Sequence, residues 1–193
     1  AKKGYAVLAF TNSDSLMLSF NGKKALLGTN PICFACPNGE NEPFCLDMST
    51  TTYTYNKLLV IKKNNKKLPE NFAADKNGNV TLNPNIAKSL LPLGGYKGFG
   101  LSIMVEILTA VLANGSLDFD IPGMYSKSKK KRDISQTYII FKIESVTTKN
   151  KFIKSLKKLS SKIRSDKKGK KSAVMPNDPE NKILEERIKY GIP

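Results

Sequence analysis

The chain has 193 residues and a formal charge of +16, with 32 basic and 16 acidic side chains and no histidine. Its hydrophobic content of 40% is that of a globular protein and excludes an intrinsically disordered chain. No apolar run reaches the roughly 18 residues that a membrane-spanning helix needs, so the sequence predicts no membrane span.

The positive charge is concentrated in the last part of the chain. Residues 121–193 hold 20 of the 32 basic residues and 7 of the 16 acidic ones. Three of the basic residues are arginines, and the stretch between Lys149 and Lys171 contains one aromatic residue, Phe152. Base reading relies on arginine, and single-strand binding relies on aromatic residues among the charges. The composition therefore argues against a nucleic-acid partner.

The first predicted elements are strands separated by polar turns. Residues 5–10 form an apolar run typical of a strand buried on both faces, and residues 11–14 follow at its C-terminal end. Hydroxyl and amide side chains at such a place occur in plain turns and also at the ligand sites of α/β proteins. Residues 28–31 make a second break, before a short strand at 32–36. Both interpretations of residues 11–14 stay open.

Three cysteines lie close together in the sequence. Cys33 and Cys36 form a C-x-x-C pattern, and Cys45 follows nine residues later. A zinc site needs four nitrogen or sulfur ligands, and a redox C-x-x-C usually opens a helix, whereas these residues belong to a strand pattern. We expect small buried thiols and no metal site. An odd number of cysteines without a signal peptide indicates a reducing compartment, hence a cytoplasmic location.

A carboxylate and several hydroxyl groups follow the next strand. Asp47 lies near the end of the strand at 44–48, and Ser49 precedes three threonines at 50–52. A carboxylate at a strand end can bind a hydroxyl-rich ligand such as ribose, whereas serine and threonine can cap a helix. Both functions are open from these residues alone. Residues 53–61 then form a helix or a strand.

A glycine-rich loop at residues 90–100 leads into the clearest helix of the chain, at 99–114. Glycines let backbone N–H groups approach a ligand, a helix N-terminus favours an anion, and Lys97 adds a positive charge. The alternative is an ordinary turn before a buried helix. Apolar residues cover most of the helix circumference and leave Ser102, Glu106 and Thr109 as a narrow polar stripe. We expect the chain to pack around this helix.

The remaining elements follow a loop at residues 127–132. A strand is predicted at 135–144, and an amphipathic helix follows, with apolar residues at i, i+4, i+7 and i+11 from Phe152 and lysines on the other side. A short strand at 173–175 and a terminal helix to about residue 190 complete the prediction. No G-x-G-x-x-G pattern occurs, so the Rossmann fingerprint is absent.

Four of the breaks form a series with a family resemblance. They are G-T-N-P at 28–31, L-D-M-S-T at 46–50, D-x-x-G-x-x-T-x-x-P at 75–84 and L-P-L-G-G-Y-K-G at 91–98. The series resembles the malate/L-lactate dehydrogenase family of the second type, which includes ureidoglycolate, sulfolactate and diketogulonate dehydrogenases or reductases. The resemblance implies a mixed α/β (α+β) fold with a mixed sheet, a buried central helix and a non-Rossmann NAD(P)-binding architecture.

The resemblance also implies a chemistry. Hydride would pass between C2 of a small 2-hydroxy or 2-oxo acid and the nicotinamide of NAD or NADP, in a homodimer. Position by position, the family's cofactor-binding residues match Ser13, Asp47, Met48, Ser49 and Lys97. Asp47 would disfavour a 2′-phosphate if it faced the ribose, and the choice between NAD and NADP stays open. The sequence does not identify the hydroxy acid.

The chain departs from the family pattern at one C-terminal turn and at its N-terminal side. The family's proline-glycine-acid turn reads Pro176-Asn177-Asp178 here and is left out of the predicted site. Family members carry an additional N-terminal segment with histidines implicated in acid–base transfer, so residues 1–126 are interpreted as an incomplete cofactor-binding domain. Residues 127–193 are interpreted as a strand-helix segment that packs on the absent part.

The missing histidines bear on activity. Alcohol oxidation needs a base that titrates near the working pH, and no catalytic residue is assigned. We expect a fragment that is inactive alone. The alternatives are a non-catalytic nucleotide-binding pseudo-enzyme and, more weakly, a basic nucleic-acid-binding protein.

Overall fold

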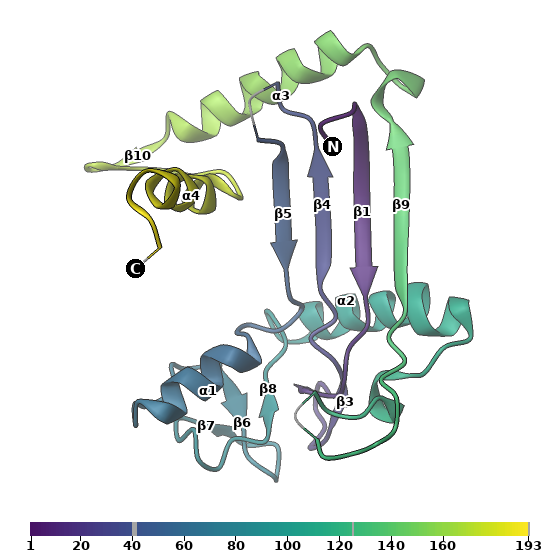
Figure 1. Ribbon diagram of the computed structural model, residues 1–193. Coiled ribbons are helices and arrows are strands. Elements are labelled where there is room, and N and C mark those ends of the chain that lie inside the picture. The colour runs from purple at the N-terminus through teal and green to yellow at the C-terminus, as the bar shows by residue number, and fades with distance from the viewer. Residues whose placement is uncertain (40–41, 125, 193) are drawn as a thin grey trace. The chain divides into compact units, whose positions relative to one another are not determined.

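The computed structural model describes residues 1–39, 42–124 and 126–192. The chain divides into two compact units (Figure 1). Unit 1 consists of Ala1–Leu8, Cys33–Asp47 and Tyr138–Pro193, and unit 2 consists of Ala9–Ile32 and Met48–Thr137. Because the chain alternates between the units, each one brings together segments that are far apart in the sequence.

Unit 1 contains most of a four-stranded sheet with the strand order β5-β4-β1-β9. Neighbouring strands run in opposite directions (Figure 1). The predicted strands in these four regions are confirmed, and the last ends in a short 3-10 turn at Ile143–Ser145. The strands are β1 (Tyr5–Thr11), β4 (Ile32–Cys36), β5 (Phe44–Met48) and β9 (Gln136–Lys142).

Helix α3 (Lys149–Arg164) packs its apolar side on this sheet. Phe152 and Leu156 contact a small core of Ala6, Cys36 and Ile143. Thr148 caps the helix by accepting a hydrogen bond from the Lys151 N–H at 3.4 Å. The lysines of α3 lie on its exposed side, as the periodicity predicts, so much of the positive charge is a solvated helix face.

The strand predicted at residues 173–175 does not form. Instead, β10 (Lys167–Lys168) pairs with β11 (Lys171–Ser172), because Gly169 adopts φ +62° and places the hairpin turn at residues 169–170. The Ala173 N–H then bonds the Asp166 carbonyl at 2.9 Å. Helix α4 (Asp178–Tyr190) follows, where the terminal helix is predicted.

Unit 2 is built on a sheet of five short strands in the order β3-β2-β8-β6-β7. β2 pairs with β8 in parallel, whereas the β2–β3, β6–β7 and β6–β8 pairs are antiparallel. This mixed sheet, together with the helices, confirms the predicted fold class. The strands are β2 (Met17–Leu18), β3 (Ala25–Leu27), β6 (Ala73–Ala74), β7 (Val80–Thr81) and β8 (Ser89–Leu90).

Helix α1 (Tyr55–Lys63) packs on this sheet through Leu58. The core around it is apolar, and the Tyr53 ring stacks on the buried Phe72 ring with centroids 4.3 Å apart. Thr54 caps the helix by accepting a bond from the Lys57 N–H at 3.3 Å. The undecided segment at 53–61 is therefore a helix, started by a threonine cap.

Helix α2 (Tyr96–Glu106) continues through a π-helical turn at Ile107–Val111, close to the predicted helix at 99–114. Its buried face includes the predicted polar stripe of Ser102, Glu106 and Thr109. In contrast, Ile107 is 52% exposed and Leu112 is 73% exposed. The expectation that the chain packs all around this helix is therefore wrong.

Within the described residues, no helix is long and apolar enough to cross a membrane.

Hydrogen bonds explain why the polar stripe faces inward. The Ser102 hydroxyl donates to the Gly28 carbonyl at 3.4 Å, and the Glu106 carboxyl accepts a bond from the Asp118 N–H at 2.8 Å. Buried polar groups are tolerated when they are paired in this way. Apolar residues cover so much of the helix that the hydrophobic pattern alone does not select the buried side.

Candidate functional site

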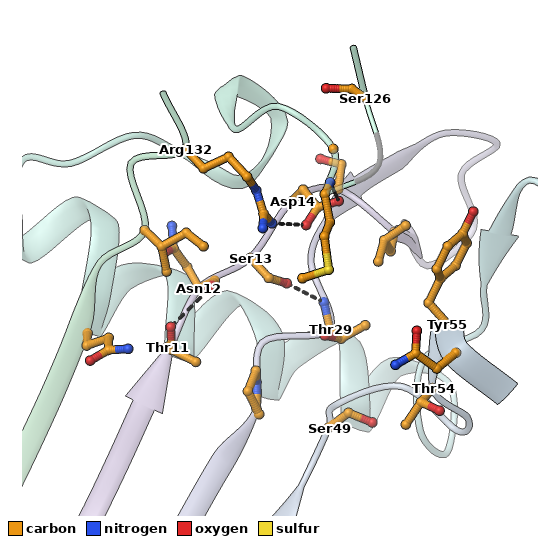
Figure 2. Close-up of a pocket in the computed structure, with 18 residues that line it drawn as sticks. Thr11, Asn12, Ser13, Asp14, Thr29, Ser49, Thr54, Tyr55, Ser126 and Arg132 are labelled. Atoms are coloured by element: carbon orange, nitrogen blue, oxygen red, sulfur yellow. Dashed lines mark hydrogen bonds and ion pairs between the residues drawn. The ribbon is translucent and has the colours of Figure 1, made fainter. Parts of the chain in front are cut away.

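A pocket of about 630 Å³ opens in unit 2 where several polar turns meet (Figure 2). This volume lies within the usual range for small-molecule and cofactor sites. Two of the predicted cofactor contacts, Ser13 and Ser49, line the pocket. Most of the other lining side chains are hydroxyl, amide or apolar. The other lining residues, which include a carboxylate and a guanidinium, are Thr11, Asn12, Asp14, Ser15, Leu16, Thr29, Pro31, Thr54, Tyr55, Asn56, Gly123, Met124, Ser126, Arg132, Ile134 and Gln136.

Ser13 is fixed by bonds to both its backbone and its side chain. Its N–H donates to Asn30 Oδ1 at 3.1 Å and to Asp118 Oδ1 at 3.3 Å. Its hydroxyl oxygen accepts a bond from the Thr29 N–H at 3.0 Å, as Figure 2 shows. The polar turn after β1 is therefore joined to the G-T-N-P break, and both border the pocket.

Gly28 makes this close approach possible. Its N–H donates to Asp118 Oδ2 at 2.6 Å. A Cβ at this position would lie 2.5 Å from Asn30 Oδ1 and 2.7 Å from the Ser13 carbonyl oxygen, and closer still to the Ser13 hydroxyl. The glycine of the G-T-N-P motif is therefore required by the contact between two turns.

Asp118 and Glu106 form a buried carboxyl pair beneath these turns. Asp118 is fully buried, and its Oδ2 also accepts a bond from the Asn30 amide at 2.7 Å. Burial raises the pKa of the Glu106 carboxyl to about 7. Hydrogen bonding to the Asp118 side chain and the negative charge of Asp118 act in the same direction. Neither residue is among the site residues predicted from the sequence. Neither is among the lining residues of the pocket.

The segment of Ser49 is tied to the same framework. Thr50 donates from both its N–H and its hydroxyl to the Thr29 carbonyl, each at 2.9 Å. The Leu93 N–H donates in turn to the Thr50 carbonyl at 2.9 Å, and the Thr52 N–H donates to the Leu91 carbonyl at 2.9 Å. Three of the four sequence motifs are thus joined in unit 2 by backbone hydrogen bonds.

The glycine-rich loop has clear conformational reasons for its glycines. Gly94 and Gly95 adopt φ values of +60° and +66°, and a Cβ on Gly98 would lie 2.5 Å from the Thr50 carbonyl oxygen. Lys97 is exposed at the start of α2 and is not among the lining residues of the pocket. Its contact with a ligand stays a prediction from the family resemblance.

Asp47 and Met48 lie at the end of β5. Asp47 is exposed and lines a separate hollow in unit 1, together with Pro176 and Asn177. Met48 is half-buried and is not among the described residues that line the unit 2 pocket. The turn that the sequence analysis left out thus borders the same hollow as Asp47. Asn177 adopts φ +72°, a conformation that asparagine tolerates better than most other residues in place of the family's glycine.

Asp178, the acid of that turn, is paired with arginine. The Arg164 guanidinium donates to its two carboxylate oxygens at 2.9 and 2.6 Å. Hydrogen bonding from Arg164 holds the pKa of the Asp178 carboxyl below its usual value. This bidentate geometry gives Asp178 a structural part in anchoring α4 to α3.

An ion pair in the pocket wall was missed by the sequence analysis. Arg132 Nη2 donates to Asp14 Oδ1 (Figure 2), and Arg132 Nε donates to the Pro122 carbonyl at 3.0 Å. Asp14 Oδ2 also accepts a bond from the Met124 N–H at 3.2 Å. The one sequence signal was an arginine at the end of a lysine run, in a segment interpreted as an exposed loop.

Comparison with known proteins places the whole chain in one family. Residues 1–193 match the family model described as malate/L-lactate dehydrogenase. Ureidoglycolate dehydrogenase (NAD(+)) of Escherichia coli K12 is 33% identical over 140 residues, which cover 72% of this chain and 40% of the relative. Malate/(S)-sulfolactate dehydrogenase of Methanothermus fervidus is 34% identical over 195 residues, covering 96% and 54%.

Solved structures agree. Sulfolactate dehydrogenase of Methanocaldococcus jannaschii superposes with a TM-score of 0.86 at 28% identity, over 96% of this chain and 54% of that one. A dehydrogenase of Sinorhizobium meliloti superposes with a TM-score of 0.88 at 25% identity, over 100% and 56%. The chain spans about half the length of the relatives it matches. The match over its full length shows that the chain belongs to the malate/L-lactate dehydrogenase family.

Proposed function

We propose that this chain is the cofactor-binding part of an NAD(P)-dependent 2-hydroxy-acid dehydrogenase, and that the unit 2 pocket holds the dinucleotide. The observation that carries the proposal is that the G-T-N-P and L-D-M-S-T motifs both line a pocket of about 630 Å³, with the glycine-rich loop joined to them by backbone hydrogen bonds. Named relatives use NAD(+), as in the ureidoglycolate enzyme, or NADP(+), as in the (2R)-3-sulfolactate enzyme of Chromohalobacter salexigens. The reaction is hydride transfer between C2 of a small hydroxy acid and nicotinamide.

The pocket offers groups suited to such a ligand. The hydroxyls of Ser13 and Ser49 match the hydrogen-bonding needs of ribose and phosphate oxygens. Arg132 places a guanidinium in the wall, a group that suits phosphate or carboxylate recognition. Asp47, Met48 and Lys97 are proposed as further cofactor contacts on the family resemblance.

A titration with NADH and with NADPH, followed by their fluorescence, tests the proposal. We expect saturable binding. Ser49→Ala and Lys97→Ala should each weaken it about three- to tenfold, because one hydrogen bond contributes about 0.5–1.5 kcal/mol. Ser155→Ala, on the exposed side of α3, is the control and should bind as the parent does. Equal binding by the parent and both site variants contradicts the assignment, and salt-dependent RNA binding without nucleotide binding favours the alternative.

We expect the 193-residue chain alone to bind nucleotide without turning over hydroxy acids. It contains no histidine. The carboxyl whose pKa is raised to about 7, Glu106, is buried and hydrogen-bonded to Asp118 rather than lining the pocket. Alcohol oxidation requires a base in reach of the hydroxyl proton. Assays with malate, lactate, ureidoglycolate and sulfolactate that follow NADH absorbance check this, and robust turnover of any of them contradicts it.

We also propose a homodimer and a cytoplasmic location. The homodimer is supported by the α2 apolar face, defined as the exposed residues Ile103, Met104, Ile107, Val111 and Leu112. Contiguous apolar surface of this kind marks interaction sites. The cytoplasmic location is supported by free thiols at all three cysteines.

A further inference from the structure

The floor of the pocket depends on one buried carboxylate. Asp118 accepts hydrogen bonds from the Ser13 N–H, the Gly28 N–H and the Asn30 side-chain amide. These donors belong to the two turns that line the pocket at Ser13 and Thr29. Asp118 therefore fixes both turns at once from a fully buried position. A residue that acts in this way positions the lining groups without touching the ligand.

Glu106 supports Asp118 from α2. Its Oε1 accepts a bond from the Asp118 N–H at 2.8 Å. The residue is 7% exposed, and its Oε2 has no hydrogen-bond partner among the described residues. A buried carboxylate with one unpartnered oxygen is costly, and a second negative charge on Asp118 adds to the cost. The arrangement therefore favours a proton on Glu106.

No cation among the described residues shifts the pKa of the Glu106 carboxyl. Burial is the largest cause that raises the pKa of its carboxyl to about 7, followed by hydrogen bonding to Asp118. The Asp118 N–H and the neutral Asn12 amide, from the turn after β1, act in the opposite direction. The packed strand Ala25–Leu27 is apolar. Among the described groups that shift this pKa, the one charged group is therefore Asp118.

We propose that Glu106 and Asp118 form a proton-dependent positioning pair for the pocket. While Glu106 is neutral, Asp118 holds the turns of Ser13 and Gly28 in place. When Glu106 releases its proton to solvent, the two buried charges repel, the turns loosen and ligand binding weakens. The effect on the ligand rests on the proposed nucleotide site, whereas the effect on the turns does not.

The direction of the pH dependence follows from proton binding. The ordered pocket holds the Glu106 proton with a pKa of about 7, and an opened form, in which the residue is hydrated, has the ordinary value of 4.5. The ordered form therefore binds more protons between these values. The ordered form of the pocket is therefore destabilised progressively as the pH rises from about 4.5 to about 7. Above about pH 7 its stability relative to the opened form changes little further. The chain contains no histidine, the side chain whose ordinary pKa lies within this interval.

Hydrogen exchange followed by mass spectrometry tests the pair on the unliganded chain. Protection of peptides covering residues 12–30, corrected for the intrinsic pH dependence of exchange, should fall about tenfold or more between pH 5 and pH 7.5, since one pKa unit corresponds to a factor of ten. Glu106→Gln keeps an acceptor for the Asp118 N–H and cannot ionise, so its protection should stay constant. Glu185→Gln, on the exposed surface of α4, should behave as the parent does.

Asp118→Asn and a nucleotide titration complete the test. Asp118→Asn should lower protection at every pH, because an amide replaces one acceptor oxygen, whereas Asp120→Asn on the same short helix should not. NADH affinity of the parent should fall between pH 6 and pH 8, and that of Glu106→Gln should not. The proposal is overturned if hydrogen-exchange protection of residues 12–30 in the parent does not change with pH, or if it declines equally in Glu106→Gln. If protection changes with pH as predicted but the chain binds no NADH at any pH, the result supports the positioning pair and contradicts the nucleotide site.

Discussion

A side chain at position 28 would meet the Asn30 side chain and the Ser13 carbonyl oxygen at 2.5 and 2.7 Å. Gly28→Ala should therefore lower the free energy of unfolding by about 2 kcal/mol or more, in the range of overpacking, and weaken NADH binding. Gly100→Ala is the matched control. A Cβ there has no neighbour within 4 Å, and alanine is favoured over glycine in a helix by about 1 kcal/mol.

Urea unfolding of the two variants measures the difference. Gly100→Ala should be at least as stable as the parent, since its position lies inside α2 and its added methyl group meets nothing. A Gly28→Ala chain with parental stability and parental NADH affinity would show that the two turns are not packed as described.

At the scale of residues, two of the five predicted cofactor contacts line the pocket, and residues held there by distant partners were missed. Ser13 and Ser49 follow strands, where polar residues are recognisable as ligand candidates. Asp118 bonds a residue 88 positions away, and Arg132 bonds one 118 positions away. Such contacts depend on tertiary packing, and no local pattern reports them.

At the scale of elements, α2 shows what periodicity predicts and what it does not. Its helical character and approximate bounds were predicted, because apolar residues without proline continue over several turns. Its buried side was not predicted. The Ser102 hydroxyl bonds the Gly28 carbonyl and the Glu106 carboxyl bonds the Asp118 N–H, so both side chains face inward and the α2 apolar face is left exposed.

The α2 apolar face carries a prediction about assembly. The parent should sediment as a dimer, and Ile107→Lys should shift it to a monomer because a lysine would be buried in an apolar interface. The melting temperature of that monomer should change little, since Ile107 is already half-exposed in the chain. Ile188→Lys on α4, which is also exposed, should remain dimeric. A monomeric parent, or a dimeric Ile107→Lys chain, contradicts the proposed interface.

At the scale of the whole molecule, the fold class followed from the sequence and the division into units did not. The resemblance carried by four motifs implied a mixed α/β fold, which the structure and its relatives share. Each unit draws on separate segments, such as Ala9–Ile32 and Met48–Thr137 for unit 2. Local patterns do not say which strands pair, because pairing depends on contacts across the chain.

The raised pKa of Glu106 predicts how stability depends on pH. Because the folded chain binds this proton more tightly than the unfolded chain, the full contribution is present below pH 4.5 and is lost as the pH rises towards about 7. The melting temperature of the parent should therefore decline by several degrees between pH 5 and pH 7.5 in calorimetry. Glu106→Gln should show a flatter profile, and a parent that is more stable at pH 7.5 than at pH 5 contradicts the assignment.

The location of the nucleotide is the central claim, and a crystal structure of the chain with NADH tests it most directly. We predict density for the dinucleotide in the unit 2 pocket, within hydrogen-bonding distance of Ser13 and Ser49 and beside Arg132. Density for NADH elsewhere on the chain, with this pocket holding solvent in crystals grown at saturating NADH, would contradict the account.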